Sequence, residues 1–178
     1  MTGMRIHTIH REQRLDGTPD EVFPFFADAF NLEALTPPLL RFRVVTPRPI
    51  DLYAGALIQY ALKLRGVPVS WLTSIQRWDP PHAFVDTQIK GPYALWHHTH
   101  TFEPTADGSG TIMSDTVRYG IAFGPFGELA NRLMVRRDVE AIFDFRAAEI
   151  PRLLEQFRAQ RLSNSRPTPG SSPGLPAS

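Results

Sequence analysis

The clearest hydrophobic pattern in the chain is an alternation of side-chain types with a period of two. It occurs on both sides of a polar segment, residues 104–110. Tryptophan, histidine and phenylalanine occupy every second position over residues 95–102, and a second alternating run follows over residues 111–119. A period of two places alternate side chains on one face of a strand. The Asp107-Gly108 dipeptide between the runs is typical of a tight hairpin turn. The pattern therefore predicts two antiparallel strands.

The length of the turn decides which side chains face one another. A two-residue loop (107–108) and a four-residue loop (106–109) give the same register. In that register the facing pairs are Trp96 with Tyr119, His98 with Val117, His100 with Asp115, and Phe102 with Met113. A three- or five-residue loop slips the register by one position and turns the apolar side chains of the second strand away. We favour the unslipped register because it builds one apolar face that carries a histidine–aspartate pair.

Similar periodicity divides the rest of the chain into further elements. Alternation predicts strands at residues 5–15, 41–46, 56–64, 67–78 and 82–89. Thr18, Pro19 and Glu21 match a capping box with proline at the first helical position, which predicts a helix to about residue 28. A second short helix is expected at residues 31–35. Apolar spacings of three and four predict a long helix over about residues 128–157, which Pro151 kinks or ends.

The order of these elements predicts an α+β fold. A seven-stranded antiparallel curved sheet would wrap around the long C-terminal helix, with two short helices after the first strand. Residues 1–160 would form this ligand-binding domain, and residues 161–178, rich in proline, serine and glycine, would form a disordered tail. A sheet curved around one helix leaves a cavity between them, which is a suitable place for a small ligand.

Composition narrows the classes of partner. The 178 residues include 19 basic and 18 acidic side chains, a formal net charge of +1, which gives no reason to expect a nucleic-acid partner. The absence of cysteine excludes disulfides, thiolate catalysis and cysteine-based zinc sites. No apolar run suggests a secretory signal or a membrane span, so the cytoplasm is the expected compartment. The oligomeric state stays open.

Several short motifs carry a resemblance to a known family. They are Pro19-x-x-Val22-Phe23-x-Phe25-Phe26, Asn31-Leu32, Leu35-Thr36-Pro37-Pro38, Gly91-Pro92-Tyr93, Trp96-His97-His98-x-His100-x-Phe102, Asp115-x-Val117-x-Tyr119 and Phe123-Gly124-Pro125-Phe126-Gly127. The chain resembles the START/Bet v 1-like (SRPBCC) superfamily, and within it the bacterial ligand-binding branch labelled polyketide cyclase/dehydrase-like. The resemblance covers about residues 4–157 and implies the helix-grip fold. It carries over no catalytic residue, because the superfamily includes carriers, receptors, cyclases and members that share the fold alone.

The histidines of the central strand are the candidate chemistry. Only His98 and His100 share a face, so a metal ion would need a third ligand from elsewhere, with Asp115 the nearest candidate. A hydrogen bond between His100 and Asp115 explains both residues without a metal, and we therefore expect no metal and no cofactor. Asp86 stays ambiguous: periodicity turns it outward, whereas one strand register places it beside His98 and Gln88 beside Trp96.

We predict a pocket wall that is mainly apolar and has one polar anchor, the His100–Asp115 pair. The expected ligand-contacting residues are Trp96, His98, His100, Phe102, Met113, Asp115, Val117, Tyr119, Trp71 and Tyr60. The first functional hypothesis is binding of a small, mainly hydrophobic ligand, such as a lipid, polyketide or aromatic compound. One alternative is a cyclase, dehydratase or hydrolase that uses His100 and Asp115 as an acid/base pair. Another is a non-catalytic interaction module with a filled core.

Overall fold

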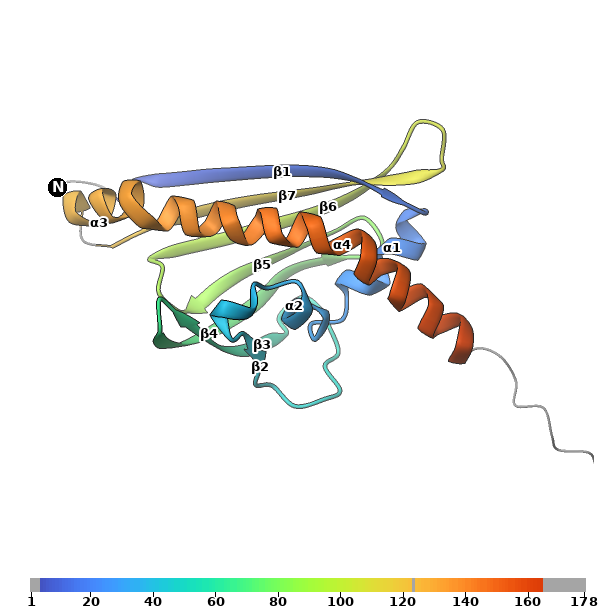
Figure 1. Ribbon diagram of the computed structural model, residues 1–178, viewed down its shortest axis with the longest axis horizontal. Helices are drawn as coiled ribbons and strands as arrows, with labels where there is room; N and C mark the ends of the chain where they lie inside the picture. The colour runs from blue at the N-terminus through green and yellow to red at the C-terminus, as the bar shows by residue number, and fades with distance from the viewer. Residues whose placement is uncertain (1–3, 123, 165–178) are drawn as a thin grey trace, which may run out of the picture.

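The computed structural model describes residues 4–122 and 124–164. Its seven strands form one antiparallel sheet in the order β1-β7-β6-β5-β4-β3-β2, which curves around the long helix α4 (Figure 1). The strands are β1 Ile6–Asp16, β2 Arg43–Val44, β3 Leu57–Leu64, β4 Val67–Asp79, β5 Ala83–Lys90, β6 Leu95–Pro104 and β7 Gly110–Gly120. The helices are α1 Pro19–Phe26, α2 Asn31–Ala34, the 3-10 turn η1 Pro38–Leu40, α3 Gly124–Ala130, the π-helical segment η2 Asn131–Val135 and α4 Arg136–Asn164. The predicted helix-grip fold is confirmed.

The hairpin of β6 and β7 has the predicted register. His100 lies opposite Asp115 and Phe102 lies opposite Met113. The turn is the four-residue version, because the Thr105 amide donates to the Gly110 carbonyl at 2.9 Å and Gly108 adopts a φ of 69°. A loop with an even number of residues keeps the apolar side chains of both strands on the same face. That face points toward α4.

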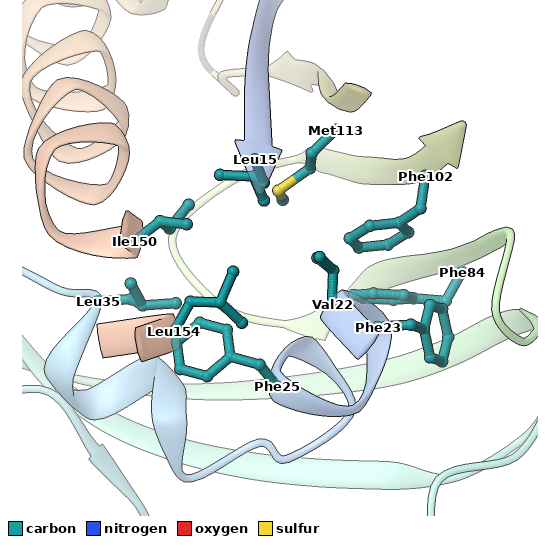
Figure 2. Packing of buried hydrophobic residues seen from close by; sticks show 10 residues of the cluster. All are labelled: Leu15, Val22, Phe23, Phe25, Leu35, Phe84, Phe102, Met113, Ile150 and Leu154. Atoms are coloured by element: carbon teal, nitrogen blue, oxygen red, sulfur yellow. The ribbon is translucent and has the colours of Figure 1, made fainter. Parts of the chain in front are cut away.

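A dense apolar core closes one end of the space between the sheet and α4. The capping box of α1 is present, with the Thr18 amide donating to Glu21 at 2.8 Å. Figure 2 shows the residues that meet there from α1, the end of α2, α4 and the sheet: Leu15, Val22, Phe23, Phe25, Leu35, Phe84, Phe102, Met113, Ile150 and Leu154. Burying a side chain of this size contributes about 1.5–3 kcal/mol each. The core therefore anchors α1 and the second half of α4 firmly on the sheet.

Two predicted boundaries differ from the structure at the C-terminal end. The helical region begins earlier than expected and includes the π-helical segment η2 before α4. Pro151 lies inside α4 and does not end it, because the burial of Ile150 and Leu154 offsets the hydrogen bond that proline removes. The helix continues to Asn164, so the first residues of the predicted tail are helical. Residues 165–178 lie outside the described residues.

The second predicted strand is much shorter than expected. Regular pairing is limited to β2, whereas alternation suggested residues 41–46. Arg41 ends the preceding 3-10 turn with a φ of 44°, a left-handed conformation that is incompatible with a strand. The amides of Val45 and Thr46 still donate to the Gln59 carbonyl. The segment therefore follows the edge of the sheet irregularly.

Candidate functional site

A cavity of about 170 Å³ lies between the sheet, the α1–α2 segment and α4. Its walls are mainly apolar and aromatic, and eight polar side chains interrupt them. The apolar residues are Phe25, Phe26, Ala29, Leu32, Leu35, Leu40, Phe42, Leu52, Ile58, Tyr60, Leu62, Trp71, Ile75, Phe84, Trp96, Met113 and Ile142. The polar ones are Asp28, Asn31, Thr36, Thr73, Asp86, His98, His100 and Arg146. Few polar groups in an apolar cavity are typical of small-molecule sites.

Three adjacent strands bring the polar groups of one wall together. In the sheet register Asp86 of β5 lies opposite His98 of β6, and His100 lies opposite Asp115 of β7. Alternation along β6 turns both histidines to the same face, toward α4. The register left open by the sequence is therefore the one that turns Asp86 inward, and Asp86 lines the cavity. Gln88 does not: its amide group binds the backbone of Tyr93, donating to the carbonyl at 2.6 Å.

The four side chains form one connected network rather than a single histidine–aspartate pair. His98 Nε2 lies 3.1 Å from Asp115 Oδ1, and His100 Nε2 lies 3.1 Å from Asp86 Oδ2. His100 Nδ1 is also 2.7 Å from Asp115 Oδ1, an ion-pair distance without the angle of a hydrogen bond. The predicted single polar anchor is thus wrong in its extent. The sequence left open the register that brings Asp86 beside His98, and this register is what extends the network.

Burial and mutual contacts shift the pKa values of the two histidines in opposite directions. Burial lowers the pKa of His98, helped by the neighbouring His100, and the two carboxylates offset this only in part. Burial also opposes the charged form of His100, but Asp115 and Asp86 outweigh it and raise its pKa. For both carboxylates burial favours the neutral acid, yet the histidines together hold the pKa of Asp86 and of Asp115 below the usual range. Protonation is therefore favoured on His100 over His98.

Arg146 of α4 is a functional candidate that the sequence analysis missed. It lines the cavity opposite the sheet, and its guanidinium carbon lies 5.0 Å from the centre of the Phe143 ring. Its Nε is buried without a hydrogen-bond partner. Burial lowers the pKa of Arg146, and Asp115 and Asp86 partly restore it. The available signal was its position in the apolar stripe of the helix, between Ile142 and Ile150 at helical spacing.

The ten predicted contact residues separate into two groups. Six line the cavity: Tyr60, Trp71, Trp96, His98, His100 and Met113. Phe102 belongs to the apolar core, and Asp115 lies behind the histidines. Val117 and Tyr119 pack in a second apolar cluster with α4, where the Tyr119 hydroxyl donates to Asn131 at 2.9 Å. Ligand contact stays a prediction for all ten residues. The α1–α2 segment supplies lining residues that the prediction did not include.

Comparison with known proteins agrees with this architecture. The model of one protein family, described as polyketide cyclase / dehydrase and lipid transport, matches residues 7–155. The chain belongs to this family. The match includes all seven strands and most of α4, and therefore the whole cavity. No curated protein matches the chain.

Several solved structures share the fold at low sequence identity. An aromatase/cyclase from a Streptomyces species is 15% identical with a TM-score of 0.68, and the match covers 85% of this chain and 95% of that one. A protein from Thermus thermophilus is 19% identical with a TM-score of 0.62, covering 90% and 100%. Norcoclaurine synthase from Thalictrum flavum is 14% identical with a TM-score of 0.62, covering 89% and 99%. These likenesses show that the chain shares the helix-grip fold with these proteins.

Among residues 4–122 and 124–164, none of the helices is both long enough and apolar enough to cross a membrane.

Proposed function

We propose that this polyketide cyclase/dehydrase-family protein binds a small, mainly apolar molecule in the cavity between the sheet and α4. The observation that carries the proposal is an apolar cavity with a cluster of partnered polar groups on one wall and the unpaired Arg146 Nε on the other. Apolar walls supply affinity through burial, and a few fixed polar groups orient the ligand.

The size of the cavity narrows the ligand class. At about 170 Å³ it is close to the cavities of about 150 Å³ that hold a benzene molecule, and smaller than the roughly 300–1,000 Å³ of drug-sized sites. A single-ring aromatic compound or a short acyl chain fits this volume. The dimensions favour such a ligand over a long lipid or a multi-ring polyketide.

Arg146 favours a ligand with an acceptor oxygen. Its buried Nε has no partner, and a buried donor without a partner costs about 1–3 kcal/mol. A carboxylate, carbonyl or phenol oxygen at this point would satisfy the donor. The preferred ligand therefore combines one apolar ring or short chain with one oxygen acceptor.

A thermal-shift series tests the binding proposal. The probes are phenol, benzoate, 4-hydroxyphenylacetate, hexanoate and palmitate. A ligand at one hundred times its Kd stabilises the folded state by about 2.7 kcal/mol, which corresponds to a rise in Tm of roughly 5–10 °C for a domain of this size. We expect the single-ring carboxylates to raise Tm more than palmitate does. No shift with any probe would contradict the proposal.

The opposite pKa shifts of His98 and His100 favour a second function, acid/base catalysis of the cyclase or dehydratase type. Neighbouring groups with separated pKa values can act as base and acid in one reaction, and both imidazoles border the cavity. On a substrate found by the binding series, His100→Gln should then reduce kcat at least about a hundredfold while His97→Gln leaves it unchanged. Full turnover by His100→Gln would refute this candidate.

A further inference from the structure

One wall of the cavity carries three candidate metal ligands from the adjacent strands β5 and β6. Asp86 Oδ2 lies 3.6 Å from His98 Nδ1 and 3.1 Å from His100 Nε2. Each of the three residues places a ligand atom within 4.8 Å of those of the other two. Zinc–ligand bonds of about 2.0–2.2 Å in tetrahedral geometry separate neighbouring ligand atoms by roughly 3.4 Å. The three side chains therefore stand close to the spacing that a bound ion requires.

We propose that Asp86, His98 and His100 bind one first-row transition-metal dication, Zn²⁺ or Fe²⁺, at the wall of the cavity. Two imidazoles and one carboxylate suit these ions, whereas Mg²⁺ and Ca²⁺ prefer ligand sets made of oxygen atoms. Sequence reasoning placed Asp115 as the nearest third ligand and expected no metal. The observed register makes Asp86 the third ligand and leaves Asp115 for another role.

Asp115 occupies the position of an outer-sphere carboxylate. Its Oδ1 lies 3.1 Å from His98 Nε2 and 2.7 Å from His100 Nδ1, the nitrogens opposite to the ones that face Asp86. Histidines that bind a metal almost always direct their second ring nitrogen to a carboxylate, carbonyl or water, which fixes the ring and its tautomer. The Asp115 carboxylate alone contacts the second nitrogen of both rings. A buried ion pair between one histidine and one aspartate does not require a second carboxylate that contacts the opposite nitrogens of both imidazoles.

The site is open on the side where a substrate would enter. All three ligands line the cavity, whereas Asp115 does not. Three protein ligands leave at least one coordination position for water or for a donor atom of a cavity ligand. Arg146 lines the same cavity, with its Nε free for an anionic group that reaches the ion. The metal site is a claim separate from the organic ligand of the cavity, and either can fail without the other.

The competing explanation is a metal-free network in which the same four side chains satisfy one another through hydrogen bonds and charge. Direct metal titration separates the two. Tag-free protein is treated with a chelator, dialysed, and titrated with Co²⁺ and with Zn²⁺ by calorimetry, with Mg²⁺ as a comparison. Co²⁺ also reports its own geometry, because tetrahedral Co²⁺ absorbs visible light far more strongly than the hydrated ion does.

The variants are chosen so that the fold survives. Asp86→Asn keeps the size of the side chain and removes its charge, and Asp115→Asn does the same behind the histidines. His97→Ala is the matched control, because His97 directly precedes His98 on β6 and its side chain lies on the opposite face. Circular dichroism and unfolding curves confirm that each variant is folded, and a His100→Gln variant replaces any that is not.

We expect one Zn²⁺ and one Co²⁺ per chain, an intense visible Co²⁺ spectrum, and little binding of Mg²⁺. Asp86→Asn should weaken Co²⁺ binding at least about a hundredfold, and Asp115→Asn should weaken it about 10–100-fold. His97→Ala should leave it within about twofold. The proposal is overturned by binding that survives Asp86→Asn or His100→Gln, or by no binding at all. If the metal proposal fails in this way but the probe molecules still raise Tm, the proposed ligand-binding function is retained.

Discussion

Replacement of Asp115 by asparagine is the most informative single change in the polar network. Asp115 is 7% exposed, and its Oδ1 contacts both histidines, at 3.1 Å and 2.7 Å. The substitution keeps the shape of the side chain and removes the charge that raises the pKa of His100. Breaking one partner of a buried pair costs about 3–5 kcal/mol. We expect a value near the lower end at pH 7.5, because His100 can release its proton and become neutral.

The dependence on pH distinguishes this mechanism from a packing defect. In the wild type the raised pKa of His100 contributes stability that is fully present below the unfolded value of about 6.5 and is lost as pH rises through the folded value. Without Asp115 this contribution disappears. The destabilisation caused by Asp115→Asn should therefore grow as pH falls from the folded pKa of His100 toward 6.5, by up to about 1.4 kcal/mol per pH unit, and should level off below 6.5.

Urea unfolding of chelator-treated protein at pH 7.5, 6.5 and 5.5 measures the effect. The matched control is Asp144→Asn, which removes a carboxylate from an exposed pair with Arg11. Exposed pairs contribute on the order of 0–1 kcal/mol, so the control should change little at any pH. An Asp115→Asn loss that is the same at all three pH values, or that equals the loss in the control, would refute the role of Asp115 in raising the pKa of His100.

Three further predictions follow from the same contacts. Phe102 is 1% exposed and packs against Phe23 and Phe26, so Phe102→Ala should cost about 3–5 kcal/mol in denaturant unfolding; a loss under about 1 kcal/mol would contradict the core assignment. Glu21→Ala removes the capping contact of α1 and should cost about 1 kcal/mol, whereas the exposed Glu12→Ala should be nearly neutral. Arg146→Met keeps the stem and removes the charge, so calorimetry should show benzoate binding weakened about 10–100-fold with phenol much less affected; equal losses for the two probes would argue against Arg146 as the anchor.

The sequence predicts the fold well where the spacing of apolar side chains matches the face of the strand or helix that is buried. Alternation along β6 and an even loop length were sufficient to pair His100 with Asp115, because an odd loop would have exposed a whole apolar face. The long helix was visible from its apolar stripe. Its end was not, since a proline that normally ends a helix is tolerated at Pro151 by the burial of its neighbours.

The site was harder to predict because its key residues contradict the local pattern. Asp86 lies on a strand whose two faces are similarly polar, and the turn at Gly91 does not determine the register to β6. Only the pairing of three strands brings Asp86 beside His98. Arg146 sits in an apolar stripe, where charge is expensive unless carboxylates lie near it, and these carboxylates come from β5 and β7. Contacts between distant segments such as these have no local signature.

Calorimetric titration of a cavity-filled variant tests the central claim, that the space between the sheet and α4 binds a ligand. Leu62 lines the cavity, whereas Leu57 on the same strand is exposed, so Leu62→Trp and Leu57→Trp form a matched pair. The probe is the single-ring compound that gives the largest thermal shift. We predict that Leu62→Trp weakens binding at least about tenfold, or 1.4 kcal/mol, while Leu57→Trp matches the wild type. Equal affinity in all three proteins would place the ligand outside this cavity and contradict the account.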